Sequence, residues 1–211
     1  LDQVVKDAIA GYFKDPVAFM KSAQAGKKVF GEQSLIAKGA PRVRPELRKE
    51  TEEAKQQAQE RKKFEQTKAA VEKLVAEYPE FKDIKEAIRV KIADEGLRID
   101  LVESSSDLFF DSGSARTKPR TRVLLGKIAR ELGNLSNHVI VEGHTDSRPY
   151  HGPFGWTNWE LSTARANAAR AVMASSGLQA NQIVEVRGLA DTMPLDRKHK
   201  DSFKNRRVSI L

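Results

Sequence analysis

The sequence predicts an α+β fold in which helices pack on one face of a small mixed β-sheet. From residue 64 to residue 211, segments with apolar residues at helical spacing alternate with short segments in which apolar and polar residues alternate. They predict the order helix, strand, helix, strand, helix, strand and strand, which suits helices packed against a sheet. The 211-residue chain has no cysteine, so its core does not depend on disulfide bonds.

The first predicted element is a short amphipathic helix within residues 1–22. Four large apolar side chains share one face of this helix at helical spacing, and Pro16 ends the pattern; they are Val5, Ile9, Tyr12 and Phe13. The chain begins at Leu1 without a methionine and contains no apolar run of about 18 residues, so we expect a fragment without its own membrane span.

Residues 23–63 are predicted to form a linker that is partly helical or disordered. Its first part contains scattered glycines and prolines and no hydrophobic periodicity. Residues 46–63 are almost all good helix formers, but they present no apolar face. A helix in this segment is therefore expected to be solvated or paired with another chain.

The folded domain is predicted to span residues 64–211. It opens with a helical stripe that ends at Pro79 and consists of Phe64, Val71, Leu74, Val75 and Tyr78. A second short helix is expected to turn four apolar side chains inward: Phe81, Ile84, Ile88 and Ile92. Gly96 ends that helix, and Leu97–Leu101 alternates as a strand does.

The second half of the domain continues the alternation of helices and strands. The pattern predicts a helix over Pro119–Leu135 and a strand over Val139–Glu142. A loop rich in Gly and Pro then leads to a helix over Asn158–Ser176, with Asn158 as N-cap and Gly177 as a left-handed C-terminal cap. Ile183–Val186 and Arg207–Leu211 are predicted to be the last two strands.

The charge of the chain permits an anionic partner. Lys and Arg number 37 against 29 Asp and Glu, a formal net charge of +8. The basic residues are spread along the chain, whereas nucleic-acid binding favours lysines interleaved with aromatics on one face. There is no phosphate-binding glycine loop, nucleophile elbow or cysteine nucleophile. Nucleic acid is therefore not the expected partner.

The best candidate for a binding site is the pair Asp146 and Arg165. Asp146 follows a predicted buried strand, and Arg165 lies in the first turns of the next predicted helix. A carboxylate accepts hydrogen bonds from an ammonium group, and a guanidinium group binds a carboxylate with two bonds. Together they suit the zwitterionic head of an amino acid. Alternatively, the two residues pair with each other as an ordinary ion pair.

Two further hypotheses about function concern residues near this pair. Glu142, His144 and Asp146 share one parity on an extended chain, with His138 in phase, and this spacing suits a metal-dependent hydrolase. A turn after Gly143 would break that row. Phe154, Trp156 and Trp159 either stack on a sugar or, as the more common case, anchor their loop in the core.

The motifs around these residues resemble the OmpA-like peptidoglycan-binding family. The matching residues appear in the expected order and span about Leu97–Leu211: Phe110, Gly113–Ala115, Val141–Asp146, Asn158, Leu161–Ser162, Arg165–Ala166 and Asn205–Val208. The resemblance implies an OmpA-like two-layer domain that is not an enzyme and holds the diaminopimelate of the peptidoglycan stem peptide, without cofactor or metal. It implies that Asp146 accepts the ligand ammonium group and Arg165 binds its carboxylate. Thr145, Asn158, Leu161 and Arg206 are implied to line the site.

Within that family, the chain is most similar to the stator branch of flagellar motors. Pro149–Tyr150, the long loop after it and the segment Asn158–Ser162 carry this similarity. Ile9–Pro16 resembles the plug segment of that branch, which lies just outside the membrane and regulates ion flow. The resemblance implies a periplasmic homodimer, tethered to the inner membrane by a helix before Leu1 that contacts a MotA-like subunit. A wall-anchoring lipoprotein without a motor role is the alternative.

Overall fold

The structure, a computed structural model, describes residues 45–104 and 108–211, with side chains from residue 54 onward. Residues 55–211 form one compact unit. Among the described residues, no helix combines the length and the apolar character needed to cross a bilayer. The residues of the predicted N-terminal helix (Val5, Ile9, Tyr12 and Phe13) lie outside the described part of the chain.

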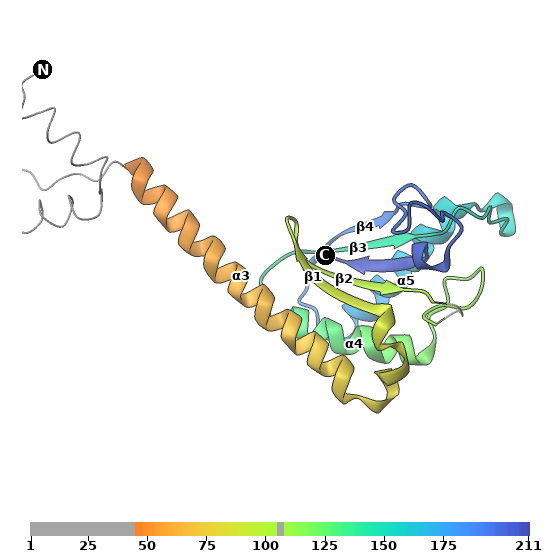
Figure 1. Cartoon of the computed structure of the whole chain (residues 1–211), viewed down its shortest axis with the longest axis horizontal. Coiled ribbons are helices and arrows are strands. Elements are labelled where there is room, and N and C mark those ends of the chain that lie inside the picture. Colours follow the sequence, from red (N-terminus) through yellow and green to blue (C-terminus); the bar gives the residue numbers. More distant parts are fainter. Residues whose placement is uncertain (1–44, 105–107) are drawn as a thin grey trace, which may run out of the picture. The chain divides into compact units, whose positions relative to one another are not determined.

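A five-stranded mixed sheet organises the compact unit (Figure 1). The strands are β1 (Ile88–Ala93), β2 (Gly96–Val102), β3 (Val139–His144), β4 (Ile183–Gly188) and β5 (Arg207–Ile210), in the spatial order β1-β2-β5-β3-β4. Only β3 and β4 run parallel, and the chain between them passes through a helix, because a parallel pair needs a long crossover. In this spatial order the last strand of the sequence, β5, lies in the centre of the sheet, between β2 and β3.

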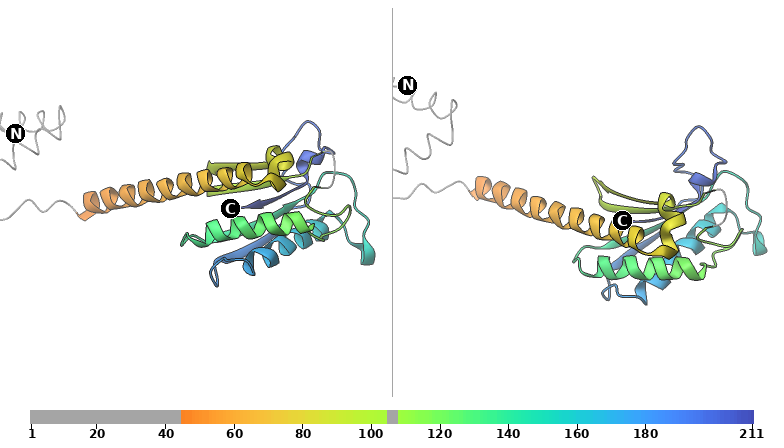
Figure 2. Two further views of the ribbon diagram at one scale, coloured as in Figure 1. Left: turned by 90° about the horizontal axis from the view of Figure 1, so that it is seen from below. Right: turned by 60° about the horizontal axis from the view of Figure 1, so that its bottom comes forward.

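Two helices lie side by side on one face of this sheet, α4 (Pro119–Gly133) and α5 (Asn158–Ala174), as Figures 1 and 2 show. Their apolar faces pack on the inward side chains of the strands, with Leu124, Ile128 and Met173 fully buried. The long helix α3 (Pro45–Glu77) adds Val71 and Val75 to the same core. The predicted α+β class, with helices on a small mixed sheet, is confirmed.

Helix α3 runs without a break through residue 64, where the sequence analysis set the start of the domain. The side chains of residues 54–63 are exposed, as expected for helix formers without an apolar face. Inward packing begins only near Phe64 and becomes complete at Val71.

The prediction of a second helix with Ile88 and Ile92 on its inner face was wrong. A 3₁₀ helix, η1 (Pro79–Ala87), buries Phe81 and Ile84 as expected, but it ends before Ile88. Ile88–Ala93 is strand β1, which forms an antiparallel hairpin with β2. The spacing of Ile84, Ile88 and Ile92 fits a helix, yet Val90 falls between them, and exposed Arg89 and Lys91 alternate with partly buried Ile88 and Val90. Partly buried side chains therefore recur at every second residue, which is the period of a strand.

The last turn of α5 also differs from the prediction. The helix ends at Ala174 with Ser175 as its C-cap, and Gly177 lies two residues further on with φ +128°. Gly177 therefore does not occupy the expected left-handed cap position, although its positive φ accounts for a glycine in this turn.

Candidate functional site

The site residues gather at one end of the sheet because of its topology. Strand β3 ends at His144, which pairs with Arg207 at the start of antiparallel β5. Residues just after β3 and just before β5, including Asp146 and Arg206, therefore meet at the same edge. Helix α5 begins at this edge too, because it follows β3 in a parallel crossover, and carboxyl ends of parallel strands commonly form ligand sites.

Asp146 is held in a defined orientation at this edge. Its side chain is buried, with 6% of the residue exposed, and Oδ1 accepts a hydrogen bond of 3.1 Å from the backbone N–H of Arg148. Its other oxygen, Oδ2, lies 3.6 Å from Nε of Arg206. Buried Thr145 donates its N–H to the carbonyl of Ala190, while its hydroxyl Oγ1 has no hydrogen-bond partner in the described part of the chain.

Helix α5 starts with a capping box, which corrects the prediction that Asn158 is the N-cap. Thr157 is the N-cap, and Oε2 of Glu160 accepts its backbone N–H at 2.7 Å. Asn158 is the first helical residue. Its side-chain Nδ2 donates to the carbonyl oxygens of Asp146 at 3.3 Å and Arg148 at 3.0 Å. It therefore ties the start of α5 to the loop that carries Asp146.

Arg165 lies two turns further along the same face of α5 and is 5% exposed. Its Nε donates a 2.9 Å hydrogen bond to the carbonyl of Ser114, and its guanidinium carbon lies 5.3 Å from the centre of the Phe110 ring. Leu161 is buried on the same face. The contacts of Asn158 and Arg165 thus join the Asp146 loop, α5 and the loop of residues 110–117 at one end of the domain.

Glu103 is a site-supporting residue that sequence reasoning missed. Its carboxylate follows β2 and accepts the backbone N–H groups of Leu108, Phe109 and Phe110 at 2.6, 3.1 and 3.3 Å. Burial raises the pKa of this carboxyl group above its usual value. The three hydrogen bonds and the charge of Arg165 lower the pKa, but they do not outweigh burial. Glu103 therefore positions the Phe110 ring under Arg165. Its only sequence signal is an acid directly after an apolar strand.

Asn205 is the second residue that was missed as a determinant of the site. It is fully buried, its Oδ1 accepts the N–H of Asp196 at 2.7 Å, and its Nδ2 donates to the carbonyls of His199 and Lys200 at 2.9 Å each. The loop it closes is joined to the Asp146 loop by a 3.0 Å bond from Ser147 N–H to the Lys200 carbonyl. Arg206 follows directly, with its guanidinium carbon 4.4 Å from the centre of the Phe203 ring.

The row predicted for a metal-dependent hydrolase does not form. Glu142 and His144 lie on the sheet face that α4 and α5 do not cover, whereas Asp146 lies beyond the end of β3. Oxygens of Glu142 lie 3.0 Å from Arg98 and 3.0 Å from Arg187, so two guanidinium groups already neutralise this carboxylate. Within residues 45–104 and 108–211, no group of three or more His, Cys, Asp or Glu is placed to hold a metal ion.

The ion pairs of Glu142 predict a pH-dependent stability. Burial raises the pKa of this carboxyl group, but the His144 ring, Arg187 and Arg98 outweigh burial and lower the pKa from 4.5 to about 2. Because the pKa is lower in the folded state, the carboxylate stabilises the fold above about pH 4.5, and this stabilisation is lost as the pH falls toward 2. We expect Glu142 to contribute on the order of 2 kcal/mol to that loss.

Urea unfolding of wild type and Glu142→Gln across this pH range measures the effect. The variant should be less stable at neutral pH and should lose less stability on acidification. Glu86→Gln, an exposed acid on η1, serves as the control and should follow the wild-type curve. Parallel curves for wild type and Glu142→Gln would contradict the assignment.

Phe154 and Trp156 in the loop before α5, and Trp159 in the first turn of α5, are not core anchors, which corrects the more common interpretation of their pattern. Phe154 is 98% exposed, Trp156 40% and Trp159 51%. The loop is held instead by Tyr150, whose hydroxyl donates to the carbonyl of Gly113 at 2.8 Å.

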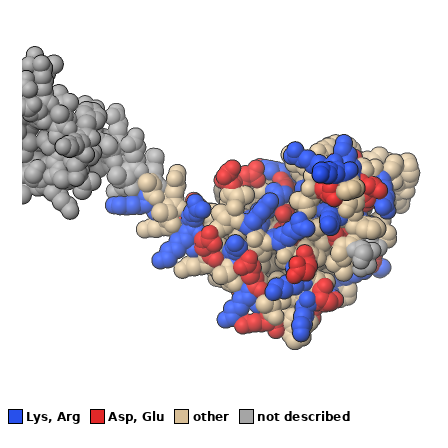
Figure 3. All heavy atoms as spheres, viewed as in Figure 1, with Lys and Arg blue, Asp and Glu red and all other residues tan. Residues whose placement is uncertain are grey.

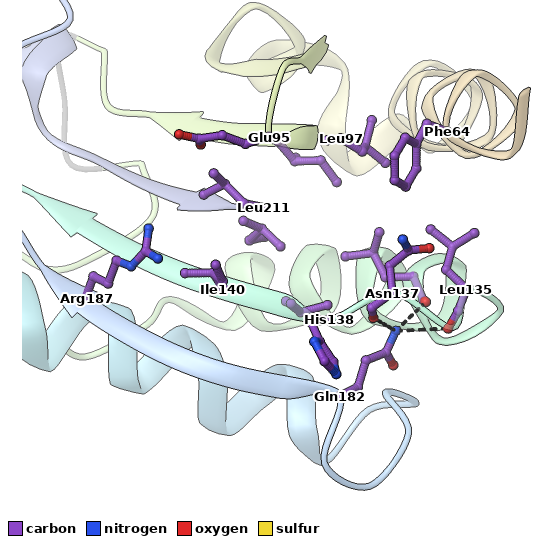
Figure 4. A pocket seen from close by; sticks show the side chains of 15 residues that line it. Phe64, Glu95, Leu97, Leu135, Asn137, His138, Ile140, Gln182, Arg187 and Leu211 are labelled. Atoms are coloured by element: carbon purple, nitrogen blue, oxygen red, sulfur yellow. Dashed lines mark hydrogen bonds between the residues drawn. The ribbon is translucent and has the colours of Figure 1, made fainter. Parts of the chain in front are cut away.

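An apolar pocket of about 420 Å³ lies at the other end of the sheet (Figure 4). It forms where β5 ends between β2 and β3, and its walls include Phe64, Leu97 and Val139. The Gln182 side chain closes one side by donating to the carbonyls of Leu132 and Leu135 at 2.9 and 3.1 Å. Neither Asp146 nor Arg165, nor any of the four residues expected to line their site, lies in the wall of this pocket. On the face shown in Figure 3, basic and acidic side chains are interspersed.

Comparisons with known proteins agree with this architecture. Residues 109–207 match the OmpA family. Motility protein B of Escherichia coli (strain K12) is 32% identical over 209 residues, which cover 96% of this chain and 67% of that protein. Motility protein B of Bacillus subtilis (strain 168) is 28% identical over 161 residues, 73% of this chain and 58% of that protein.

Among solved structures, the cell wall anchor of the T6SS from Pseudomonas aeruginosa is 29% identical and superimposes with a TM-score of 0.51, covering 61% of this chain and 89% of that chain. Together with the match to the OmpA family, this similarity confirms the OmpA-like fold that the motifs of Val141–Asp146 and Asn205–Val208 predicted.

Proposed function

The chain belongs to the motility protein B family, and from this premise we propose that it binds peptidoglycan non-covalently and anchors the stator of a flagellar motor to the cell wall. The family membership confirms the resemblance to the stator branch that the sequence motifs indicated. The similarity to a cell wall anchor supports the same function. One observation carries the proposal: a buried acid just after β3 and a buried arginine on α5 lie at one end of the domain, where hydrogen bonds tie α5 to both neighbouring loops.

The ligand of this site is the diaminopimelate of the stem peptide. The Asp146 carboxylate accepts hydrogen bonds from its ammonium group, and the Arg165 guanidinium group binds its carboxylate. Thr145 supplies a hydroxyl group without a hydrogen-bond partner in the described residues, while Asn158, Leu161 and Arg206 line the site. Buried charges that are already oriented by hydrogen bonds need little reorganisation when a zwitterion arrives. This arrangement favours binding.

Binding to purified sacculi tests the proposal. We expect the chain to co-sediment with intact sacculi and to be released by free diaminopimelate, but not by an equal concentration of 1,5-diaminopentane, which has ammonium groups but no carboxylate for Arg165 to bind. Failure to co-sediment with sacculi, or release by both compounds to the same extent, would contradict the proposal.

The remaining parts of the proposal concern the assembly. We propose a periplasmic homodimer, tethered to the inner membrane and joined to a MotA-like subunit through a membrane helix. The apolar stripe of Val5, Ile9, Tyr12 and Phe13 supports a role of residues 1–22 as a plug that regulates ion flow. In cells that contain both full-length subunits, deleting these residues should cause ion leak and slow growth. Unchanged growth would count against the plug.

A further inference from the structure

The outer side of α5 carries a groove that the diaminopimelate site does not use. It has a volume of about 580 Å³, which is within the range of roughly 300 to 1,000 Å³ of ligand pockets. Its lining combines two indoles, an apolar strand residue and three polar side chains of α5: Trp156, Trp159, Val186, Glu160, Thr163 and Asn167. These are the only two tryptophans of the chain. Both are substantially exposed, whereas tryptophan is usually largely buried.

Hydrogen bonds fix the backbone that carries the two indoles. The turn before Trp156 is closed twice, since Gly152 N–H donates to the Trp156 carbonyl at 2.9 Å and Trp156 N–H donates to the Pro153 carbonyl at 3.1 Å. Trp159 lies in the first turn of α5, directly after the capping box. In Figures 1 and 2 the segment Pro153–Gly155 projects beyond the sheet. An exposed indole on a backbone that is fixed in this way is suited to binding, because the backbone loses little conformational freedom on contact.

The polar side chains of the groove retain hydrogen-bonding capacity. The two bonds that Glu160 accepts from Thr157 both use Oε2, which leaves Oε1 as an acceptor. Asn167 accepts a bond from Arg170 through Oδ1, which leaves its Nδ2 as a donor. The Thr163 hydroxyl donates to the Trp159 carbonyl and retains its acceptor capacity. Flat aromatic surface beside acceptors and donors matches a sugar ring, which has an apolar face and a rim of hydroxyl groups.

We propose that this groove is a carbohydrate subsite that binds the glycan strand of the cell wall, with Trp159 and Trp156 stacking on sugar rings. The inference rests on the proposed function, because it takes the cell wall as the ligand. The two sites share the start of α5: Asn158, which bonds to the Asp146 loop, directly precedes Trp159 on that helix. In peptidoglycan, sugar and stem peptide are covalently joined, so one polymer can contact both. The carboxylate of Glu160 in the groove disfavours the headgroups of anionic lipid.

Glycan strands freed of stem peptides by an amidase provide the probe. Two indole N–H signals are expected in the ¹⁵N NMR spectrum of the chain, and both should shift when these strands are added. Trp159→Ala should weaken binding of the strands at least 10-fold, and Trp156→Ala should weaken it as well. Val123→Ala, which removes an equally exposed apolar side chain from α4, serves as the matched control and should bind as wild type does. Unfolding temperatures of all variants show whether each is folded.

The outcomes separate this inference from the proposed function. If wild type binds intact sacculi but not peptide-free strands, the carbohydrate subsite is wrong and the anchor function stands. Equal affinity of Trp159→Ala and wild type for the strands would also overturn the subsite. The same holds if the tryptophans promote binding to phosphatidylglycerol vesicles and not to glycan. If intact sacculi are not bound at all, the proposed function itself fails.

Discussion

Asp146→Asn is expected to abolish measurable binding to sacculi while leaving the domain folded. The substitution keeps the shape of the side chain, and its Oδ1 can still accept the Arg148 N–H. It removes the negative charge that the ligand ammonium group requires. Truncating one partner of a buried, hydrogen-bonded charge pair costs about 2 to 5 kcal/mol in binding, or roughly 30-fold to several thousand-fold in affinity. Binding isotherms on sacculi, with thermal unfolding in parallel, measure both quantities.

Asp191→Asn is the matched control for this experiment, because Asp191 is an exposed acid in a neighbouring loop. It should bind sacculi as wild type does, and it corrects for the change in net charge. If Asp146→Asn and Asp191→Asn bound equally well, Asp146 would not be the acceptor of the ligand ammonium group.

Arg165 needs a different substitution from Asp146. Its contacts with the Ser114 carbonyl and the Phe110 ring hold the loop of residues 110–117, so Arg165→Ala would disturb that loop as well as the site. Arg165→Lys keeps the positive charge and removes the planar fork that binds a carboxylate with two bonds. We expect it to weaken sacculus binding about 10-fold or more. Arg122→Lys, on the exposed side of α4, should have no effect.

The sequence predicted those elements whose periodicity is long and unambiguous. The apolar stripes of α4 and α5 extend over several turns, and the predicted ranges lie within two residues of the observed ones at both ends. Strand β1 was missed because three isoleucines spaced by four residues mimic a helix over a short segment. The N-cap was misassigned to Asn158 although Thr157 and Glu160 have the spacing of a capping box.

The candidate site residues could be predicted from their residue types, but the contacts that hold them in place could not. Arg165 is bonded to a carbonyl 51 positions away in the sequence, and Asp146 lies beside Arg206 across the sheet edge. Contacts of this kind depend on the order of strands in the sheet, and periodicity carries no information about that order. Backbone acceptors such as the Ser114 carbonyl also leave no mark on residue type. For this reason Glu103 was not singled out and Asn205 was named only as part of the motif Asn205–Val208, although both side chains bond to backbone groups that hold the site.

Gly143→Ala is expected to destabilise the domain by at least about 3 kcal/mol, because overpacking against backbone cannot be relieved by a rotamer change. A Cβ atom at residue 143 would lie 2.0 Å from the carbonyl oxygen of Ser162, on α5. Strand β3 and helix α5 would have to move apart. Asp146 follows that strand and Arg165 lies on that helix, so the substitution should also weaken sacculus binding at temperatures where the variant is folded.

Urea unfolding and sacculus binding of Gly143→Ala measure the two effects, and Gly126→Ala is the control. Gly126 lies inside α4, where an added Cβ would come within 3.3 Å of the Ser176 hydroxyl oxygen and 3.4 Å of its Cβ, contacts with a side chain that a small shift relieves. Alanine in a helix interior is favoured over glycine by about 0.5 to 1 kcal/mol, so this variant should be at least as stable as wild type. The close approach of α5 to β3 at Gly143 places Asp146 and Arg165 at one edge of the domain. A Gly143→Ala variant as stable as wild type would show that the spacing between strand and helix is not what positions the two charges.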